Sequence, residues 1–164
     1  MPIPRSQLRL TDEELEELLT TERTLRVGTV SPDGGPHVVP LWFVWHGGVI
    51  WLNNLKRSRR NRDLGEGSPV ALCVDTGHEY WELRGAVLYG TPVPADPDDP
   101  SLPEIRRTFG SKYFYGADIP DVKSHQWMRM VPDRIVSWDF RKIPAGRDGR
   151  AALSRSAAPT ETAS

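Results

Sequence analysis

The apolar residues of the segment 12–21 recur with the period of a helix. Leu15, Leu18 and Leu19 form one stripe, which predicts a helix over residues 12–21. Residues 11–14 have the spacing of a capping box at its start, and their acidic side chains suit the positive end of the helix dipole. The sequence therefore predicts a short amphipathic helix ahead of everything else.

The segments that follow have the composition and the two-residue period of strands, and turns rich in Gly, Pro and Asp separate them. Such turns favour antiparallel pairing. Pro40 lies inside one of these segments and cannot donate a ladder hydrogen bond, so it predicts an edge, a bulge or a bend. The set is large enough for a barrel, and we expect a mainly β chain with a few helices. The expected strands cover residues 25–30, 37–45, 49–53, 70–75, 80–93 and 131–141.

The remaining segments predict one domain and a tail. A polar, basic stretch at 56–65 and an apolar stripe at 102–109 predict two further helices, on either side of the later strands. Residues 144–164 contain almost nothing to bury, so we expect them to be disordered. The folded part is then a single domain over residues 1–143.

The composition of the chain excludes some classes of partner. The 164 residues carry 21 basic and 22 acidic side chains, a net charge of -1, so no overall field attracts the chain to nucleic acid or to an anionic membrane. Apolar runs are short and no signal-peptide hydrophobic region is present. We expect a cytoplasmic protein without a membrane or nucleic-acid partner.

Few residues have the spacing of known catalytic motifs. The four histidines lack the spacing of a metal site, and Cys73 lies in a predicted strand, where we expect a small core residue. His37 and His125 could act as acid or base, although single histidines in such positions are more often structural. If the chain is an enzyme, a bound cofactor is the natural carrier of its chemistry.

Two local compositions leave alternatives open. Residues 56–62 contain five basic side chains, which could bind a phosphate or could form a solvated helix face; a nucleic-acid site there has no second basic patch to extend it. Trp42, Trp45 and Trp51 lie on consecutive expected strands and could line a pocket for a planar ligand or fill the barrel core.

Several motifs in their order resemble one family. They are the turn and strand over 31–43, the run Ser58-Arg59-Arg60-x-Arg62-Asp63-Leu64, the strand over 68–75 and the strand with Leu83-Arg84-Gly85-Ala86-Val87. The chain resembles, over about residues 11–142, the pyridoxamine 5'-phosphate oxidase-like split β-barrel flavoproteins, including their actinobacterial deazaflavin branch. The resemblance implies a split β-barrel and a homodimer with FMN or a deazaflavin (coenzyme F-420) at its interface.

The resemblance also implies a cofactor site. Ser58, Arg59 and Arg60 match the family's Ser-Arg-Lys phosphate motif, with arginine at the third position, and Asp63 replaces the family's asparagine. The residues matched to the cofactor ring and its ribityl chain are Val39, Pro40, Leu41, Trp42, Asn53 and Asn54.

No catalytic side chain follows from the resemblance. Substrate selection would then belong to residues 111–127, which could equally form a lid or an interface strap, and Trp138 could cover the partner's cofactor or seal the barrel. The candidate substrate residues are Lys112, Tyr113, Tyr115, His125, Trp127 and Trp138. True pyridoxamine-phosphate oxidase activity is not expected, because the C-terminal Arg-His-Arg type signature is absent.

Two functions fit the resemblance. The first is an oxidoreductase that acts on a small organic substrate by hydride transfer at a cofactor in the dimer interface. The alternative is a non-catalytic protein of the same fold that binds flavin or haem.

Overall fold

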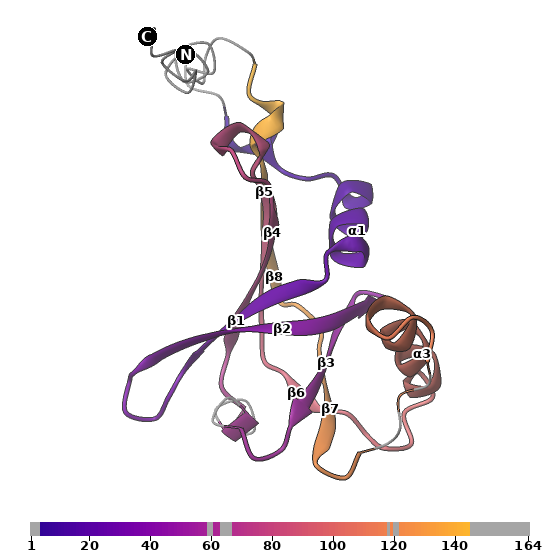
Figure 1. The fold of residues 1–164 in the computed structure, drawn as a ribbon. Coiled ribbons are helices and arrows are strands. Elements are labelled where there is room, and N and C mark those ends of the chain that lie inside the picture. The colour runs from indigo at the N-terminus through magenta and orange to yellow at the C-terminus, as the bar shows by residue number, and fades with distance from the viewer. Residues whose placement is uncertain (1–3, 59–60, 63–66, 118, 120–121, 145–164) are drawn as a thin grey trace, which may run out of the picture.

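The computed structural model describes residues 4–58, 61–62, 67–117, 119 and 122–144. Within these residues, eight strands form one sheet in the order β6-β7-β3-β2-β1-β4-β5-β8, and each pair is antiparallel (Figure 1). The strands are β1 (Thr24–Val30), β2 (Pro36–His46), β3 (Val49–Leu55), β4 (Val70–Thr76), β5 (Arg84–Gly90), β6 (Val93–Pro94), β7 (His125–Met130) and β8 (Arg134–Asp139).

The long strand β2 belongs to both halves of this sheet. Its first part, from Pro36 to Trp42, pairs with β1, and its last part, from Phe43 to His46, pairs with β3. The sheet therefore changes partners within β2 and curls, so that β4, β5 and β8 lie above β2 in Figure 1 and β3, β6 and β7 lie below it. The expected split β-barrel is confirmed.

Helices α1 (Asp12–Thr21) and α3 (Leu102–Tyr113) pack against different parts of the sheet (Figure 1). Leu18 and Leu19 of α1 are fully buried in a core that spans both halves of the sheet, together with Leu25, Val27, Phe43, Ile50, Leu52, Val70, Leu72, Val74, Ala86, Leu88, Met128 and Met130. A second core lies under α3 and contains Val44, Trp51, Leu102, Ile105, Phe109, Tyr113 and Trp127.

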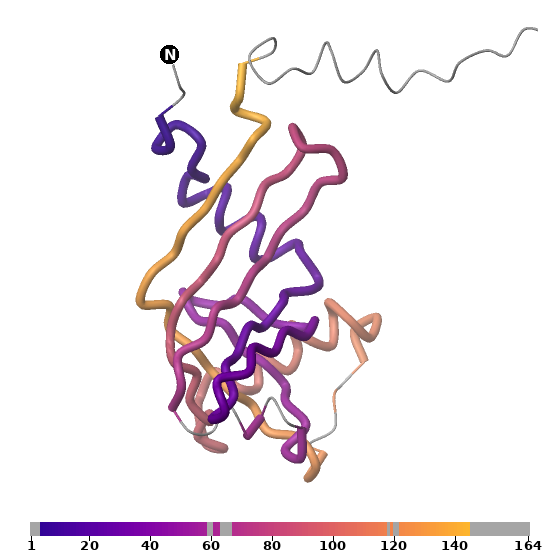
Figure 2. Tube along the Cα trace, turned by 90° about the vertical axis from the view of Figure 1, so that its left-hand side faces the viewer, coloured from indigo at the N-terminus to yellow at the C-terminus, as the bar shows by residue number. Residues whose placement is uncertain are grey.

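The two ends of the described fold meet beside α1. The amide of Leu10 donates to Ser137 Oγ on β8 at 3.1 Å, and Lys142 Nζ donates to the carbonyl oxygen of Arg9 at 2.7 Å. Figure 2 shows the indigo start of the chain next to the strand that leads to its yellow end. The first turn of the chain thus becomes part of the barrel instead of extending away from it.

The helix over residues 12–21 is confirmed, including its cap. Thr11 Oγ1 accepts from the amide of Glu14 at 3.2 Å, and Glu14 Oε2 accepts from the amide of Thr11 at 2.8 Å. The helix expected over 102–109 continues to Tyr113. Among the described residues, no helix is both long and apolar enough to cross a membrane.

Three expectations differ from the structure. The strand expected over 80–93 starts as a 3-10 turn, because Glu82 Oε2 accepts from the amides of His78 and Glu79; β5 and β6 follow it. The strand expected over 131–141 is observed only over Arg134–Asp139, as β8. Strand β7, which was not predicted, comes before it in the chain. Cys73 is only half-buried, since Leu72 and Val74 are the residues of β4 that point into the core. The expected tail, apart from residue 144, lies outside the described residues.

Candidate functional site

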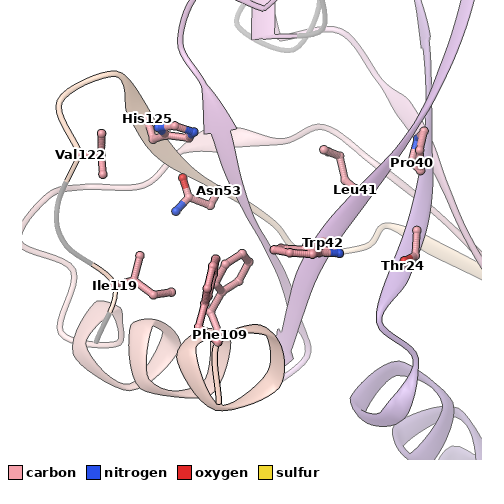
Figure 3. Close-up of a pocket in the computed structure, with 10 residues that line it drawn as sticks. Thr24, Pro40, Leu41, Trp42, Asn53, Phe109, Ile119, Val122 and His125 are labelled. Carbon is pink, nitrogen blue, oxygen red and sulfur yellow. The ribbon is translucent and has the colours of Figure 1, made fainter. Parts of the chain in front are cut away.

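A pocket of about 600 Å³ lies where β2 and β3 face the end of α3 (Figure 3). It has two ends. Thr24 and Pro40 stand at one, which we name the β1 end, and Ile119, Val122 and His125 stand at the other, which we name the α3 end. The residues that line it are Thr24, Pro40, Leu41, Trp42, Asn53, Phe109, Phe114, Ile119, Val122 and His125.

The break in the pairing of β2 creates the β1 end. Pro40 pairs with Arg26 of β1, but the ladder to β3 begins only at Phe43. Pro40 has no N–H to donate, so it suits a strand edge without a second neighbour. The predicted edge at Pro40 is confirmed, and it places the prolyl ring and Leu41 in the pocket wall.

Trp42 forms an aromatic wall in the middle of the pocket. Its ring stacks on Tyr113, with centroids 4.5 Å apart and planes 10° from parallel, and Phe109 meets it edge-on at 6.2 Å. The side chain is still 44% exposed. Tyr113 can cover only one face of the indole, so the remaining surface is free to contact a flat ligand.

Tyr113 is a fixed support for this wall. Its hydroxyl accepts from the amide of Phe43 at 3.0 Å and shares its proton between the carbonyl oxygens of Phe43 and Arg23, at 2.7 Å and 2.8 Å. Burial raises the pKa of Tyr113 to about 12. The phenol is therefore neutral at ordinary pH, and its proton is committed to the backbone.

The ladder between β3 and β7 brings two polar residues to one side of the sheet. Asn53 pairs with Trp127 and Leu55 pairs with His125, so Asn53 and His125 are diagonal neighbours on the same face. Both line the pocket (Figure 3). Asn53 Oδ1 is buried and has no hydrogen-bond partner among the described residues, while His125 Nδ1 lies 3.1 Å from Ser124 Oγ.

Gly110 allows the chain after α3 to return across the helix and close the α3 end. A Cβ at this position would lie 2.4 Å from the carbonyl oxygen of Ala117 and 3.9 Å from Cγ1 of Ile119. The amides of Phe114 and Gly116 donate to the carbonyl of Gly110 at 2.8 Å and 3.0 Å. The close approach that glycine permits therefore sets where Ile119 meets the pocket.

The structure brings several sequence-predicted residues together. Pro40, Leu41 and Trp42, matched to the cofactor, share the pocket with Asn53 and with the substrate candidate His125.

Other predicted residues lie outside the pocket. Val39 packs against the core of α1, and Asn54 is fully buried and belongs to the opposite face of β3 from Asn53. Ser58 Oγ accepts from the amide of Asn61 at 3.1 Å, so this hydroxyl stabilises the turn in which it lies. Arg59 and Arg60 lie outside the described residues.

The remaining substrate candidates do not line the pocket either. Trp127 is buried beneath Phe109, Lys112 Nζ lies 4.3 Å from the ring centroid of Phe43, and Tyr115 is fully exposed at a positive φ of 54°. Trp138 lies across Gly85 in the neighbouring strand.

Sequence reasoning did not name five residues of the lining as site residues, although Phe114, Ile119 and Val122 belong to the segment 111–127 that was expected to select substrate. The apolar stripe of Leu102, Ile105 and Phe109 could have indicated that the helix packs on the second half of the sheet, which brings its end close to β2. No local pattern points to Thr24. The missed residues are Thr24, Phe109, Phe114, Ile119 and Val122.

The lining suits a flat, mostly apolar ligand. Within the described part of the chain, the pocket has no Asp, Glu, Lys, Arg, Ser or Cys in its wall. Its polar side-chain groups are the Thr24 hydroxyl, the Trp42 indole N–H, the Asn53 amide and the His125 imidazole. A few polar groups in an apolar cavity can orient a ligand.

Comparison with known proteins agrees with this architecture. A conserved hypothetical protein from Mycobacterium tuberculosis is 23% identical with a TM-score of 0.74, over 86% of this chain and 92% of that one. An FAD and haem binding protein from Mycobacterium smegmatis is 21% identical with a TM-score of 0.66, over 87% and 78%. A protein named F-420 reductase is 21% identical with a TM-score of 0.58, over 77% and 98%.

These similarities concern the fold, and no curated protein matches the chain in sequence. A family model does match it. The model is described as pyridoxamine 5'-phosphate oxidase and covers residues 11–139, from the cap of α1 to the end of β8. Since this match includes all eight strands of the described sheet, the chain belongs to the pyridoxamine 5'-phosphate oxidase family.

Proposed function

We propose that this protein is a flavin- or deazaflavin-dependent oxidoreductase that acts on a small organic substrate. The pocket is the observation that carries the proposal. It combines an exposed indole face, an apolar wall and a few polar groups, and it is large enough for a planar ring with a small molecule beside it. The names of the FAD-binding and F-420 reductase neighbours agree with such a ligand.

The β1 end fits the ring of FMN or of coenzyme F-420. Pro40 and Leu41 give it a flat apolar wall, and the exposed part of Trp42 offers a stacking surface. We assign the phosphate to Ser58, Arg59 and Arg60, as the family motif implies. Val39 and Asn54 would act through the backbone of their strands. When bound, the cofactor supplies hydride transfer, which no side chain of the lining can perform.

This chain's residues would orient the ligands and keep water out. Tyr113 fixes the plane of Trp42, and Phe109 and Ile119 make the α3 end apolar. Orienting two reactants in one dry pocket accounts for much of the acceleration expected from a protein of this kind.

We further propose that two copies pack through the outer face of the sheet. The apolar residues of this outer face are Gly28, Val30, Pro36, Val38, Pro40, Ala71, Cys73, Val87 and Val136, which strand register places on one side of β1, β2, β4, β5 and β8. The ion pair between Arg26 and Asp75 lies on the same side. Val38 is 66% exposed on it and Val30 is 58% exposed. Since Pro40 belongs both to this face and to the pocket, a second copy seated there would border the ligand.

Titration with FMN and, separately, with coenzyme F-420 tests the proposal. We expect saturable quenching of protein and ring fluorescence by one of them, near one site per subunit. The double variant Ser58→Ala, Arg60→Ala should lower its affinity at least about tenfold, or 1.4 kcal/mol. Arg107→Ala, an exposed arginine of α3, is the control and should not. Binding of neither cofactor would overturn the proposal.

Non-catalytic flavin or haem binding is a second candidate, because His125 places an imidazole in the pocket lining. Titration with haem distinguishes it. A Soret shift that is lost in His125→Ala, without binding of either flavin cofactor, would favour this candidate.

A further inference from the structure

Among the described residues, the wall of the α3 end holds no carboxylate, ammonium or guanidinium group. Phe109, Ile119 and Val122 are apolar, and Asn53 is neutral at every pH. Lys112, in the last turn of α3, places its amine over the ring of Phe43. A charged ligand would lose its hydration here, and His125 could pair with an anion only when its imidazole is protonated. This end therefore disfavours anions while His125 is neutral.

The same end is shaped for a flat group. Trp42 and Phe109 both line the pocket, and their rings meet at 62°. Trp127, beneath Phe109, supports that ring edge-on at 88°. Ile119 stands at the far limit of this end, where the return of the chain over Gly110 holds it (Figure 3). Flat rings fill such a space with more contact than branched or extended molecules do.

One buried atom at this end lacks a partner. Asn53 Oδ1 is out of contact with solvent, and no described residue donates a hydrogen bond to it. A buried acceptor that stays unsatisfied is costly, and the lining offers no other donor aimed at it. Asn53 lines the pocket, so a turn of its side chain would bring Oδ1 to the O–H or N–H group of a ligand and remove that cost. A ligand with only acceptors would not remove it.

We propose that the α3 end selects a substrate that is an uncharged, flat ring compound bearing an O–H or N–H donor, which Asn53 Oδ1 accepts. Calling this ligand the substrate rests on the proposed oxidoreductase function; the chemistry of the ligand rests on the pocket alone. His125, at the same end, is free to contact the ring through its Nε2 side, since Ser124 takes up Nδ1.

Three matched probes test the donor and the charge separately. They are 2-naphthol, 2-methoxynaphthalene, which lacks the donor, and 2-naphthoate, which carries a negative charge. Isothermal titration of the full chain at neutral pH, with and without FMN, should show that 2-naphthol binds at least tenfold more tightly than either of the others. Equal affinity for 2-naphthol and 2-methoxynaphthalene, or tighter binding of 2-naphthoate, would overturn the proposal.

Variants of Asn53 test whether this residue causes the preference for 2-naphthol. Asn53→Leu should reduce the preference for 2-naphthol over 2-methoxynaphthalene to less than threefold, whereas Asn53→Asp keeps an acceptor oxygen and should retain it. Thr24→Val removes a hydroxyl at the β1 end and should change the affinity for both probes alike. A preference that survives in a folded Asn53→Leu protein would contradict the assignment to Asn53.

FMN and coenzyme F-420 binding, measured on the same samples, separates this inference from the proposed function. A naphthol preference without binding of either cofactor keeps the ligand class and removes the oxidoreductase. Cofactor binding without the preference removes the ligand class alone.

Discussion

Tyr113 of α3 is hydrogen-bonded to both backbone groups of Phe43 of β2. The amide of Phe43 donates to the phenol oxygen at 3.0 Å, and the phenol donates to the carbonyl of the same residue at 2.7 Å. The ring that carries this hydroxyl also stacks on Trp42, the preceding residue of β2. One side chain thus anchors the helix to the strand and fixes the aromatic wall of the pocket.

The two roles of Tyr113 can be separated by substitution. Tyr113→Phe removes the hydroxyl and leaves the ring, so we expect the free energy of unfolding to fall by about 1–2 kcal/mol because Phe43 loses its partner. Affinity for FMN should change less than threefold. Tyr113→Leu should lose stability and FMN affinity together. Urea unfolding measures the stability of each variant, and FMN titration measures its affinity. Equally weak FMN binding in the two variants would show that the hydroxyl and the ring cannot be assigned separate roles.

Gly110 sets the position of the pocket's end wall. Gly110→Ala would place a methyl group 2.4 Å from the carbonyl oxygen of Ala117, so the segment that carries Ile119 must move. We expect a loss of about 1–3 kcal/mol in the free energy of unfolding, although alanine favours the helix itself. We also expect weaker binding of 2-naphthol. Arg107→Ala, on the exposed side of the same helix, should alter neither, and equal behaviour of the two variants would contradict the prediction.

Much of the fold could be predicted because most elements have one buried face. The stripe of α1 and the alternation in β1 and β4 directly indicate which residues face the core. Strand β7 could not be recognised in this way. Trp127 belongs to the core under α3 and Met128 to the core under α1, so neighbouring residues of this strand are both buried and the alternation is lost.

The candidate site was predictable only in part, for a different reason. Pro40 indicates a strand edge because it has no N–H to donate to a ladder. The resemblance to a family indicates Leu41, Trp42 and Asn53. Ile119 and Thr24 enter the pocket only because α3 and β1 bring distant segments together. The neighbourhood of Thr24 carries no sign of it, and the segment 111–127, although expected to select substrate, did not single out Ile119.

The amine of Lys112 makes stability depend on pH. Burial lowers its pKa from 10.5 to about 8, and Arg23 adds to the effect. The folded state then holds this proton less tightly than the unfolded state, so unfolding becomes less favourable as pH rises above about 8. Tyr113 has the opposite effect. Because its pKa is raised in the folded state, the unfolded state loses the phenol proton first, and the free energy of unfolding falls as pH rises above 10.

We therefore expect Lys112→Met to be more stable than the parent protein at neutral pH, with a difference that shrinks as pH rises from 8 towards 10. Thermal unfolding over this range measures it. Lys56→Met, at an exposed lysine, is the control and should follow the parent at every pH. A constant difference between Lys112→Met and the parent would show that the amine does not titrate in this window.

Val38 tests whether the outer face joins two copies. It is 66% exposed in the single chain and pairs with Gly28, so little else covers it. A buried carboxylate without a partner is costly in an interface, so Val38→Glu should convert the proposed homodimer to a monomer. Val93→Glu is the matched control: this valine is 46% exposed but lies on β6, at the opposite edge of the sheet. Sedimentation velocity should give a dimer for the parent protein and for Val93→Glu and a monomer for Val38→Glu; the same mass for all three would place any interface elsewhere.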